Sequence, residues 1–154
     1  MTPLDFPTAG RFDGCAHLLP VRIYYEDTDF SGLVYHANYL RYFERGRSDF
    51  LRCAGVDHTT LLGSESPTAL TVTRMTLDFI RPARVDDALL VRTVYENVKG
   101  PRIFIAQAIW RGDEEIASAA VEACCISLTG RPKKPPLLLV ERLKPFLERS
   151  ASTF

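Results

Sequence analysis

The sequence predicts a single α+β domain in which an antiparallel sheet packs against one main helix. Residues 37–54 carry apolar side chains at helical spacing. Apolar segments with strand patterns follow this region, and short turns join them. The chain has 154 residues, of which 46% are hydrophobic, so it suits one domain with a substantial core.

The beginning of the chain predicts an arm and a first strand. Residues 1–18 show no periodic pattern, so we interpret them as an N-terminal arm before a domain of residues 19–150. In residues 19–25, Val21 and Ile23 alternate with polar side chains, which indicates a strand. A loop is expected over residues 26–35, which contain Asp, Ser and Gly.

The main helix is expected over residues 37–54. Gly55 favours its end there. Gly46 lies inside the helix and costs about 1 kcal/mol relative to Ala, so we expect it to permit close approach to a sheet. A short helix is expected near residues 59–62.

The remainder of the chain predicts a run of strands and a last helix. Gly100 and Gly112 mark turns between strands. A C-terminal helix is expected over residues 137–149, interrupted or restarted at Pro145. The expected strands cover residues 68–81, 88–98, 102–110 and 116–128. Several of them are apolar on both faces, and one helix covers only one face. A second copy of the chain is therefore expected to cover the other face or an edge, giving a homodimer or homotetramer.

Composition narrows the class of function. The chain has 19 basic and 19 acidic side chains, which argues against a general nucleic-acid binder. It has no apolar run long enough to cross a bilayer, and residues 1–20 lack the features of a signal peptide. The four cysteines lack metal-ligand spacing. We expect a cytoplasmic protein with buried, reduced thiols and no metal site.

Candidate chemistry is concentrated in residues 25–39, where a polar loop joins the first strand to the helix. Carboxylates at Glu26, Asp27 and Asp29 precede the helix, whose first amides carry partial positive charge. Such amides stabilise an oxyanion, and a nearby carboxylate can act as general base or nucleophile. His36 can orient substrate or pass a proton. Helix capping and turn formation explain the same residue types equally well from composition alone.

Two longer stretches carry a family resemblance. Tyr-Glu-Asp-Thr-Asp-Phe-Ser-Gly-Leu-Val-Tyr-His-Ala-Asn covers residues 25–38, and Met-Thr-Leu-Asp-Phe-Ile-Arg-Pro-Ala-Arg-Val-Asp-Asp covers residues 75–87. Together they resemble the 4-hydroxybenzoyl-CoA thioesterase family, especially its YbgC branch, which is associated with the Tol–Pal system of bacteria. The resemblance spans residues 19–130. It implies a hot-dog fold, a curled antiparallel sheet wrapped around a long helix. It also implies an acyl-CoA thioesterase without a cofactor, and active sites at a subunit interface.

The resemblance also assigns roles to residues. It implies that Asp29 is the catalytic carboxylate, as general base or nucleophile, and that the oxyanion donor is the backbone N–H of His36. The side chains of His36 and Tyr25 are implicated as well. Asp27 is expected to fix the loop through backbone N–H groups. The positions assigned to substrate binding are Gly32, Val34, Tyr35 and Asn38.

The phosphates of CoA require cations, and Lys99 and Arg102 are the preferred pair because they flank one turn. The other candidates are Arg81, Arg84, Arg131, Lys133 and Lys134. Three alternatives use the same fold: a thioesterase acting on acyl carrier protein, a non-catalytic acyl-CoA-binding module, and, less well supported, a dehydratase. The carboxylate at Asp29 favours an enzyme over a binding module, because a binder does not need it.

Overall fold

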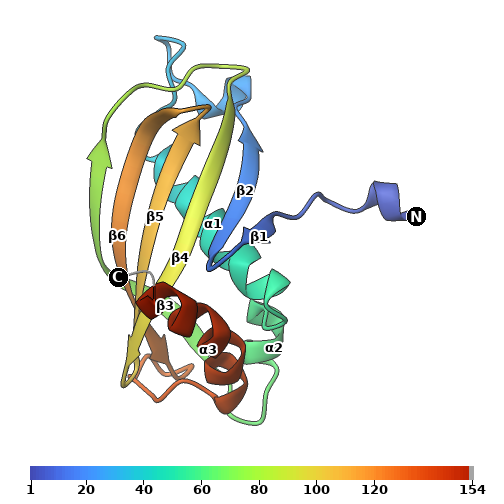
Figure 1. Ribbon diagram of the computed structural model, residues 1–154, viewed down its shortest axis with the longest axis vertical. Coiled ribbons are helices and arrows are strands. Elements are labelled where there is room, and N and C mark those ends of the chain that lie inside the picture. Colours follow the sequence, from blue (N-terminus) through green and yellow to red (C-terminus); the bar gives the residue numbers. More distant parts are fainter. Residues whose placement is uncertain (153–154) are drawn as a thin grey trace.

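The computed structural model describes residues 1–152 and contains a six-stranded antiparallel sheet. The strand order is β1-β2-β4-β5-β6-β3, and the sheet curls around the long helix α1 (Figure 1). The strands are β1 (Arg11–Asp13), β2 (Ala16–Arg22), β3 (Ala69–Phe79), β4 (Ala88–Lys99), β5 (Arg102–Arg111) and β6 (Glu114–Ile126). The helices are α1 (Asn38–Cys53), α2 (His58–Leu62) and α3 (Leu137–Ser152), with 3-10 turns η1 (Pro3–Asp5) and η2 (Tyr25–Asp27). The predicted α+β class is therefore confirmed.

The main difference from expectation lies at the N-terminal end. The short strand β1 falls inside the segment interpreted as an arm, and β2 begins at Ala16 and ends at Arg22, several residues before the expected end. A three-residue strand has too few positions to display a period, so its sequence carries no signal. The two strands form a small hairpin in register, with Phe12 opposite His17.

His17 anchors this hairpin to α1. Its side chain is fully buried, and its Nε2 lies 2.8 Å from Oδ2 of Asp49 on the helix. The backbone N–H of Gly10 donates to the same Asp49 oxygen at 2.7 Å. The ring of Phe12 packs against Phe50, with centroids 5.1 Å apart. These contacts hold the start of the chain on the main helix and give His17 a structural role.

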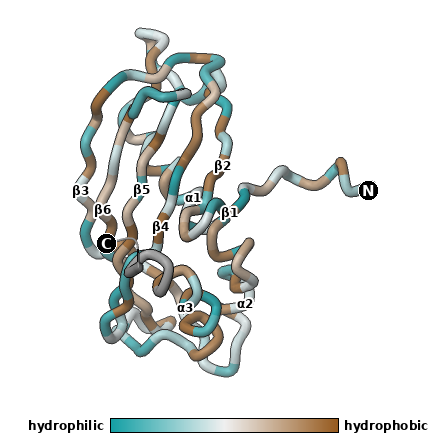
Figure 2. The backbone as a smooth tube through the Cα atoms, in the orientation of Figure 1, coloured by the Kyte–Doolittle hydropathy of each residue, from teal (hydrophilic) through white to brown (hydrophobic). Residues whose placement is uncertain are grey.

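The core lies between α1 and the inner face of the sheet. Figure 2 shows hydrophobic stretches in the central strands β4 and β5. From the helix, the aromatic rings of Tyr42, Phe43 and Phe50 are fully buried against this face. Burying each large apolar side chain contributes about 1.5–3 kcal/mol.

Gly46 lies where α1 crosses the sheet most closely, as expected. A Cβ atom at this position would lie 2.8 Å from Oγ1 of Thr93 and 2.8 Å from Cγ1 of Val91. Both distances are shorter than an ordinary contact, so the backbone of the helix reaches the sheet only because the side chain is absent.

We expect Gly46→Ala to destabilise the protein. Ala favours a helix interior by about 1 kcal/mol over Gly. Overpacking typically costs about 1–3 kcal/mol, so the steric term is expected to prevail and the free energy of unfolding to fall. Urea denaturation measures the change. Arg41→Ala, at an exposed position of the same helix, is the control and should change stability by less than about 0.5 kcal/mol. An unchanged or higher midpoint for Gly46→Ala would contradict the close approach.

Two further predictions, on the cysteines and on membrane-spanning segments, can be compared with the structure. All four cysteines are free thiols, and Cys124 and Cys125 are buried. The expectation of buried thiols is wrong for Cys53, which is exposed, and Cys15 is only half-buried. Among residues 1–152, none of the helices combines the length and the apolar character needed to span a membrane.

Candidate active site

The loop between β2 and α1 folds back on itself as a narrow ribbon. Thr28 and Val34 form an isolated antiparallel bridge, and the backbone N–H of Asp29 donates to Leu33 O at 3.0 Å. Gly32 closes the turn with a positive φ of 78°, a conformation that favours glycine. The ribbon is fixed to the body because Val34 N–H donates to Ala83 O at 2.9 Å. Asp29 therefore lies at the turn of an ordered ribbon.

The carboxylate of Asp29 is exposed and ionised. Its Oδ1 accepts hydrogen bonds from the hydroxyl of Ser31 and from the backbone N–H of Ser31, the latter at 2.8 Å. These two bonds hold the pKa of Asp29 below its usual value, because they favour the charged form. The charged oxygen needed for a general base or nucleophile is thus available at neutral pH.

Asp29 does not cap the helix. No side chain caps α1 at its N-terminal residue Ala37. Within residues 1–152, the backbone N–H groups of His36 and Ala37 donate to no protein acceptor. The first helical amide is different, since Asn38 N–H donates to Tyr35 O at 2.8 Å. The helix start therefore presents two free amides, and capping does not explain the polar loop.

A groove of about 280 Å³ opens at this end of the helix. Its walls come from the loop, from the first turn of α1 and from the segment after β3: Leu33, Val34, His36, Tyr39, Phe79, Ile80, Arg81 and Pro82. The imidazole of His36 is exposed and packs between Tyr35 and Phe79, at ring-centroid distances of 4.5 and 6.2 Å. The groove is mostly apolar and has His36 in its wall, an arrangement that suits an apolar chain with a polar end.

Several hydrogen bonds fix the loop against α1. Asp27 O accepts from Tyr35 N–H at 3.0 Å and from Nδ2 of Asn38 at 2.7 Å. The Asp27 carboxylate accepts from Tyr24 N–H at 2.7 Å, the structural role expected for it. Burial and the neighbouring Asp27 carboxylate raise the pKa of Tyr42. Asn38 thus acts on the site by holding the loop that carries Asp29 and His36.

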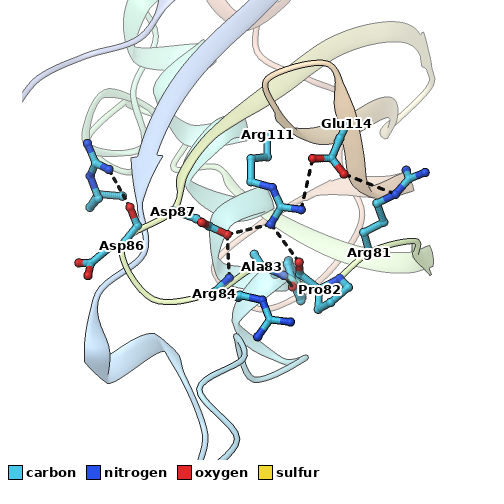
Figure 3. A network of polar contacts seen from close by, with 10 residues as sticks. Arg81, Pro82, Ala83, Arg84, Asp86, Asp87, Arg111 and Glu114 are labelled. Carbon is cyan, nitrogen blue, oxygen red and sulfur yellow. Dashed lines mark hydrogen bonds and ion pairs between the residues drawn. The ribbon is translucent and has the colours of Figure 1, made fainter.

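A polar network fixes the far wall of the groove (Figure 3). Nη1 of Arg111 donates to Oδ2 of Asp87 at 2.8 Å and to Pro82 O at 3.1 Å. Arg84 N–H donates to the same Asp87 oxygen at 2.8 Å. Arg81 lies 3.7 Å from Glu114 through its Nε. The guanidinium of Arg84 forms no ion pair with the described side chains of residues 1–147, so its charge remains available beside the loop.

The structure does not bring every predicted site residue to one place. The ring of Tyr25 is 86% exposed and lines none of the groove. Lys99 and Arg102 flank the β4–β5 turn. This turn lies at the opposite end of the sheet from the loop, because the start of β4 pairs with the end of β2 (Figure 1). Within one chain, these two cations are remote from His36.

Sequence comparison identifies the family. The model of the thioesterase superfamily matches residues 31–118, which include the helix start and most of the sheet. The chain belongs to the thioesterase superfamily and is a thioester hydrolase. It is 41% identical over 109 residues to the acyl-CoA thioesterase YbgC of Haemophilus influenzae, covering 71% of this chain and 79% of that protein. It is 33% identical over 127 residues to the acyl-CoA thioester hydrolase YbgC of Escherichia coli O6:H1, covering 81% and 93%.

A solved structure is similar to this one in fold. A probable thioesterase from Bartonella henselae superposes with a TM-score of 0.77 at 40% identity, covering 79% of this chain and 99% of that one. The expected hot-dog fold is confirmed for this thioester hydrolase.

Sequence reasoning did not identify all residues that shape the groove. Phe79 and Ile80 are 52% and 46% exposed and line it, although both were assigned only to a strand. The sequence feature that could have identified them is a pair of large apolar residues directly before Arg81-Pro82, where a strand must end. Ser31, which binds the Asp29 carboxylate, was also missed.

Proposed function

We propose that this thioester hydrolase cleaves acyl-CoA to a free acid and CoA. The uncapped start of α1 carries the proposal, because the N–H groups of His36 and Ala37 donate to no acceptor within residues 1–152 and His36 lines the groove. The thioester carbonyl oxygen accepts hydrogen bonds from these amides, which stabilise the charge that develops on it. The names of the YbgC relatives support the acyl-CoA substrate.

In the proposed reaction, the Asp29 carboxylate either deprotonates a water molecule that attacks the carbonyl carbon or attacks that carbon itself. In both routes the carbon–sulfur bond breaks and the electron pair leaves with the CoA sulfur. When water attacks, the free acid forms directly and the proton held by Asp29 is released to solvent or to the CoA thiolate. When Asp29 attacks, the acyl group remains on it as a mixed anhydride, which water then hydrolyses to the free acid and the regenerated carboxylate. The thiolate is a good leaving group, so no strong acid is required. The imidazole of His36, held between two aromatic rings, orients the thioester. No step requires a cofactor or metal ion, so dialysis against a chelator should leave activity unchanged.

The direct test is a hydrolysis assay on the purified protein. Short aliphatic, long aliphatic and aromatic acyl-CoAs are compared, with acyl carrier protein thioesters in parallel. Turnover of acyl-CoA is expected. Turnover of acyl carrier protein thioesters alone would favour that alternative substrate, and binding without turnover would contradict the enzymatic proposal. A cytoplasmic location remains a prediction from composition, and a link to the Tol–Pal system remains one from the family resemblance.

The pH dependence provides a second test. Because its hydrogen bonds lower the pKa of Asp29, the carboxylate stays ionised to a lower pH than an ordinary aspartate. Ser31→Ala removes the hydroxyl donor, so the pKa should rise and kcat/KM should begin to fall at a higher pH on acidification. Ser31→Thr retains a hydroxyl and is the matched control. If kcat/KM fell at the same pH in wild type and in Ser31→Ala, the Ser31 hydroxyl would have no influence on the catalytic carboxylate.

The active enzyme is proposed to be a homodimer, the minimal form of the expected dimer or tetramer. The loop between β2 and α1 and the end of β3 carry large apolar side chains that are exposed in the single chain: Tyr24, Tyr25, Phe30, Tyr35, Phe79 and Ile80. Such a patch is typical of an interface. The strand β3 lies beside it at the edge of the sheet and pairs only with β6. Its free backbone edge can pair with another strand.

The charges of β3 fit a second copy of β3. Arg74, Thr76 and Asp78 alternate with half-buried Met75 and Leu77, which pack on the core, so the charged side chains lie on the outer face. Neither Arg74 nor Asp78 forms an ion pair among the side chains that the structure describes, those of residues 1–147. An antiparallel pair centred on Thr76 places Arg74 opposite the partner's Asp78, and the reverse. Because the dimer is symmetric, two such pairs of opposite charge form, and neither charge is left unpaired.

This pairing also determines where Lys99 and Arg102, the residues predicted to bind the CoA phosphates, lie in the dimer. Arg102 is in register with Cys124, and Cys124 with Thr71 at the start of β3. In the proposed dimer, the start of β3 lies opposite the end of the partner's β3, next to the partner's groove. The Lys99–Arg102 turn of one copy is therefore brought to the end of the sheet where the other copy binds its thioester. This arrangement supports the predicted phosphate-binding role in a dimer.

A further inference from the structure

A cluster of side chains with metal-binding groups lies where the N-terminal hairpin meets α1. His17 on β2, together with Asp49 and Cys53 on the helix, contributes one possible ligand atom per residue, and these atoms lie within 4.8 Å of one another. Nε2 of His17 is 2.8 Å from Oδ2 of Asp49, and Sγ of Cys53 is 3.7 Å from the same oxygen. Asp49 is 32 positions from His17 and 4 positions from Cys53 in the chain, so sequence spacing did not suggest a metal site.

The helix presents two of the possible ligands together. Asp49 and Cys53 are about one turn apart, so their side chains lie on the same face of α1. This face is turned toward the hairpin, because both His17 and the backbone N–H of Gly10 reach the Asp49 carboxylate. Two ligands four residues apart on a helix, completed by a third from elsewhere in the fold, are a common construction of metal sites.

The donor set matches a divalent ion such as Zn²⁺. Imidazole nitrogen, thiolate sulfur and carboxylate oxygen are the donors that Zn²⁺ takes in proteins. The carboxylate of Asp49 and the thiolate of Cys53 together carry two negative charges, which balance the charge of the ion, while His17 binds as a neutral ligand. Cys53 is exposed, so both an ion and a water molecule as fourth ligand can reach the cluster from solvent.

The distances in the cluster are close to those of a tetrahedral zinc site. Zinc–ligand bonds of about 2.0–2.3 Å separate nitrogen from oxygen by about 3.4 Å and sulfur from oxygen by about 3.6 Å. The distance from Sγ to Oδ2 is already near this value, and the distance from Nε2 to Oδ2 must increase by about 0.6 Å. The N–H of Gly10, 2.7 Å from Oδ2, holds the carboxylate in place as an outer hydrogen bond of the kind that orients metal ligands.

The imidazole of His17 can bind an ion through Nε2. The ring is fully buried, and its Nδ1 has no hydrogen-bond partner in the described part of the chain. Such an unpartnered nitrogen is unusual for a histidine whose only role is structural. Because Nδ1 is unpartnered in either neutral tautomer, moving the ring proton from Nε2 to Nδ1 breaks no hydrogen bond there. The bound ion takes the place of that proton beside Asp49, and the thiol proton of Cys53 is released to solvent.

We propose that His17, Asp49 and Cys53 form a binding site for a divalent transition-metal ion, with Zn²⁺ as the best match, and that the ion fastens the β1–β2 hairpin to α1. Coordinate bonds to residues of both elements then replace a hydrogen-bonded contact between them. The role of the ion is structural, because Asp49 and Cys53 lie in the second half of α1, whereas the free amides of His36 and Ala37 precede the helix. Removal of the ion should therefore loosen the hairpin and leave acyl-CoA turnover intact.

Cobalt binding tests the site directly. Co²⁺ takes the same ligands as Zn²⁺, and a thiolate bound to Co²⁺ gives an intense charge-transfer absorption band in the near ultraviolet. One equivalent of Co²⁺ added to reduced, metal-free protein should produce this band, and Zn²⁺ should abolish it by displacing Co²⁺. Cys53→Ser should lose the band. Asp49→Asn, which keeps a side-chain oxygen for the N–H of Gly10, should bind Co²⁺ at least about tenfold more weakly.

Cys15→Ser is the matched control, because Cys15 is a half-buried free thiol in the hairpin turn and lies outside the cluster. It should keep the band. Zn²⁺ should raise the thermal unfolding midpoint of wild type and of Cys15→Ser by roughly 5–10 °C once free Zn²⁺ is about 100 times its dissociation constant. Hydrogen exchange of residues 10–18 should slow in the same samples. Neither effect should appear in Cys53→Ser, whose substitution is at an exposed position and should leave the fold intact.

Three results would overturn the proposal. Wild-type protein that shows no thiolate band with Co²⁺ has no such site. A band that survives Cys53→Ser, or that is lost in Cys15→Ser, places the ion on a different thiol. Loss of acyl-CoA hydrolysis when the ion is removed contradicts its structural role. The absorption band, the unfolding midpoint and hydrogen exchange do not depend on turnover, so a failure of this site and a failure of the proposed hydrolysis are observed separately.

Discussion

Asp29→Asn is expected to reduce kcat/KM for acyl-CoA by about 10²–10⁴-fold, the usual contribution of a positioned general base. The amide oxygen of Asn still accepts from Ser31, so the ribbon retains its shape. The charge that activates water or attacks the carbonyl is lost. Because the Asp29 side chain is exposed and packs against no core residue, the melting temperature should stay near that of wild type.

Asp113→Asn is the matched control, since Asp113 is an exposed aspartate in the β5–β6 turn. It should retain full activity. Equal activity of Asp29→Asn and wild type would remove Asp29 from the reaction. A single turnover in oxygen-18 water then distinguishes the two routes of the active enzyme: isotope found in the Asp29 carboxylate identifies it as a nucleophile.

The regular elements were predictable because their signals are local. The period of residues 37–54 located α1 to within one residue at each end, and Gly46 and Gly55 predicted its approach to the sheet and its end. The turns at Gly100 and Gly112 likewise follow from residue types that tolerate positive φ. Strand β1 was not predicted, because three residues are too few to show a period.

The candidate site was predictable only in part. The polar loop and the helix start were visible in sequence, but capping explained them equally well until the structure left the amides of His36 and Ala37 free. The remoteness of Lys99 and Arg102 was not visible, since strand register is a long-range property that no local pattern carries.

Asp78→Arg is expected to weaken the dimer strongly. In the proposed β3 pair, this change replaces two opposite-charge pairs by two like-charge contacts, each between an introduced guanidinium and the partner's Arg74. Each cross-strand pair is worth about 0.2–1 kcal/mol, and like charges are unfavourable by similar amounts. The total is about 1–4 kcal/mol, which corresponds to a rise of roughly 5- to 1,000-fold in the dimer dissociation constant. Because each site needs a second copy, activity at nanomolar enzyme should fall with the dimer.

The double variant Arg74→Asp/Asp78→Arg restores opposite charges in the same register, so both the dimer and the activity should recover. Glu141→Arg, at an exposed position of α3, makes the same change of charge away from β3 and should leave the dimer intact. Sedimentation equilibrium gives the dissociation constants, and dilution assays follow the activity. Recovery in the double variant separates a specific pairing of Arg74 with the partner's Asp78 from a general effect of net charge. A dimer unaffected by Asp78→Arg would exclude the Thr76-centred register.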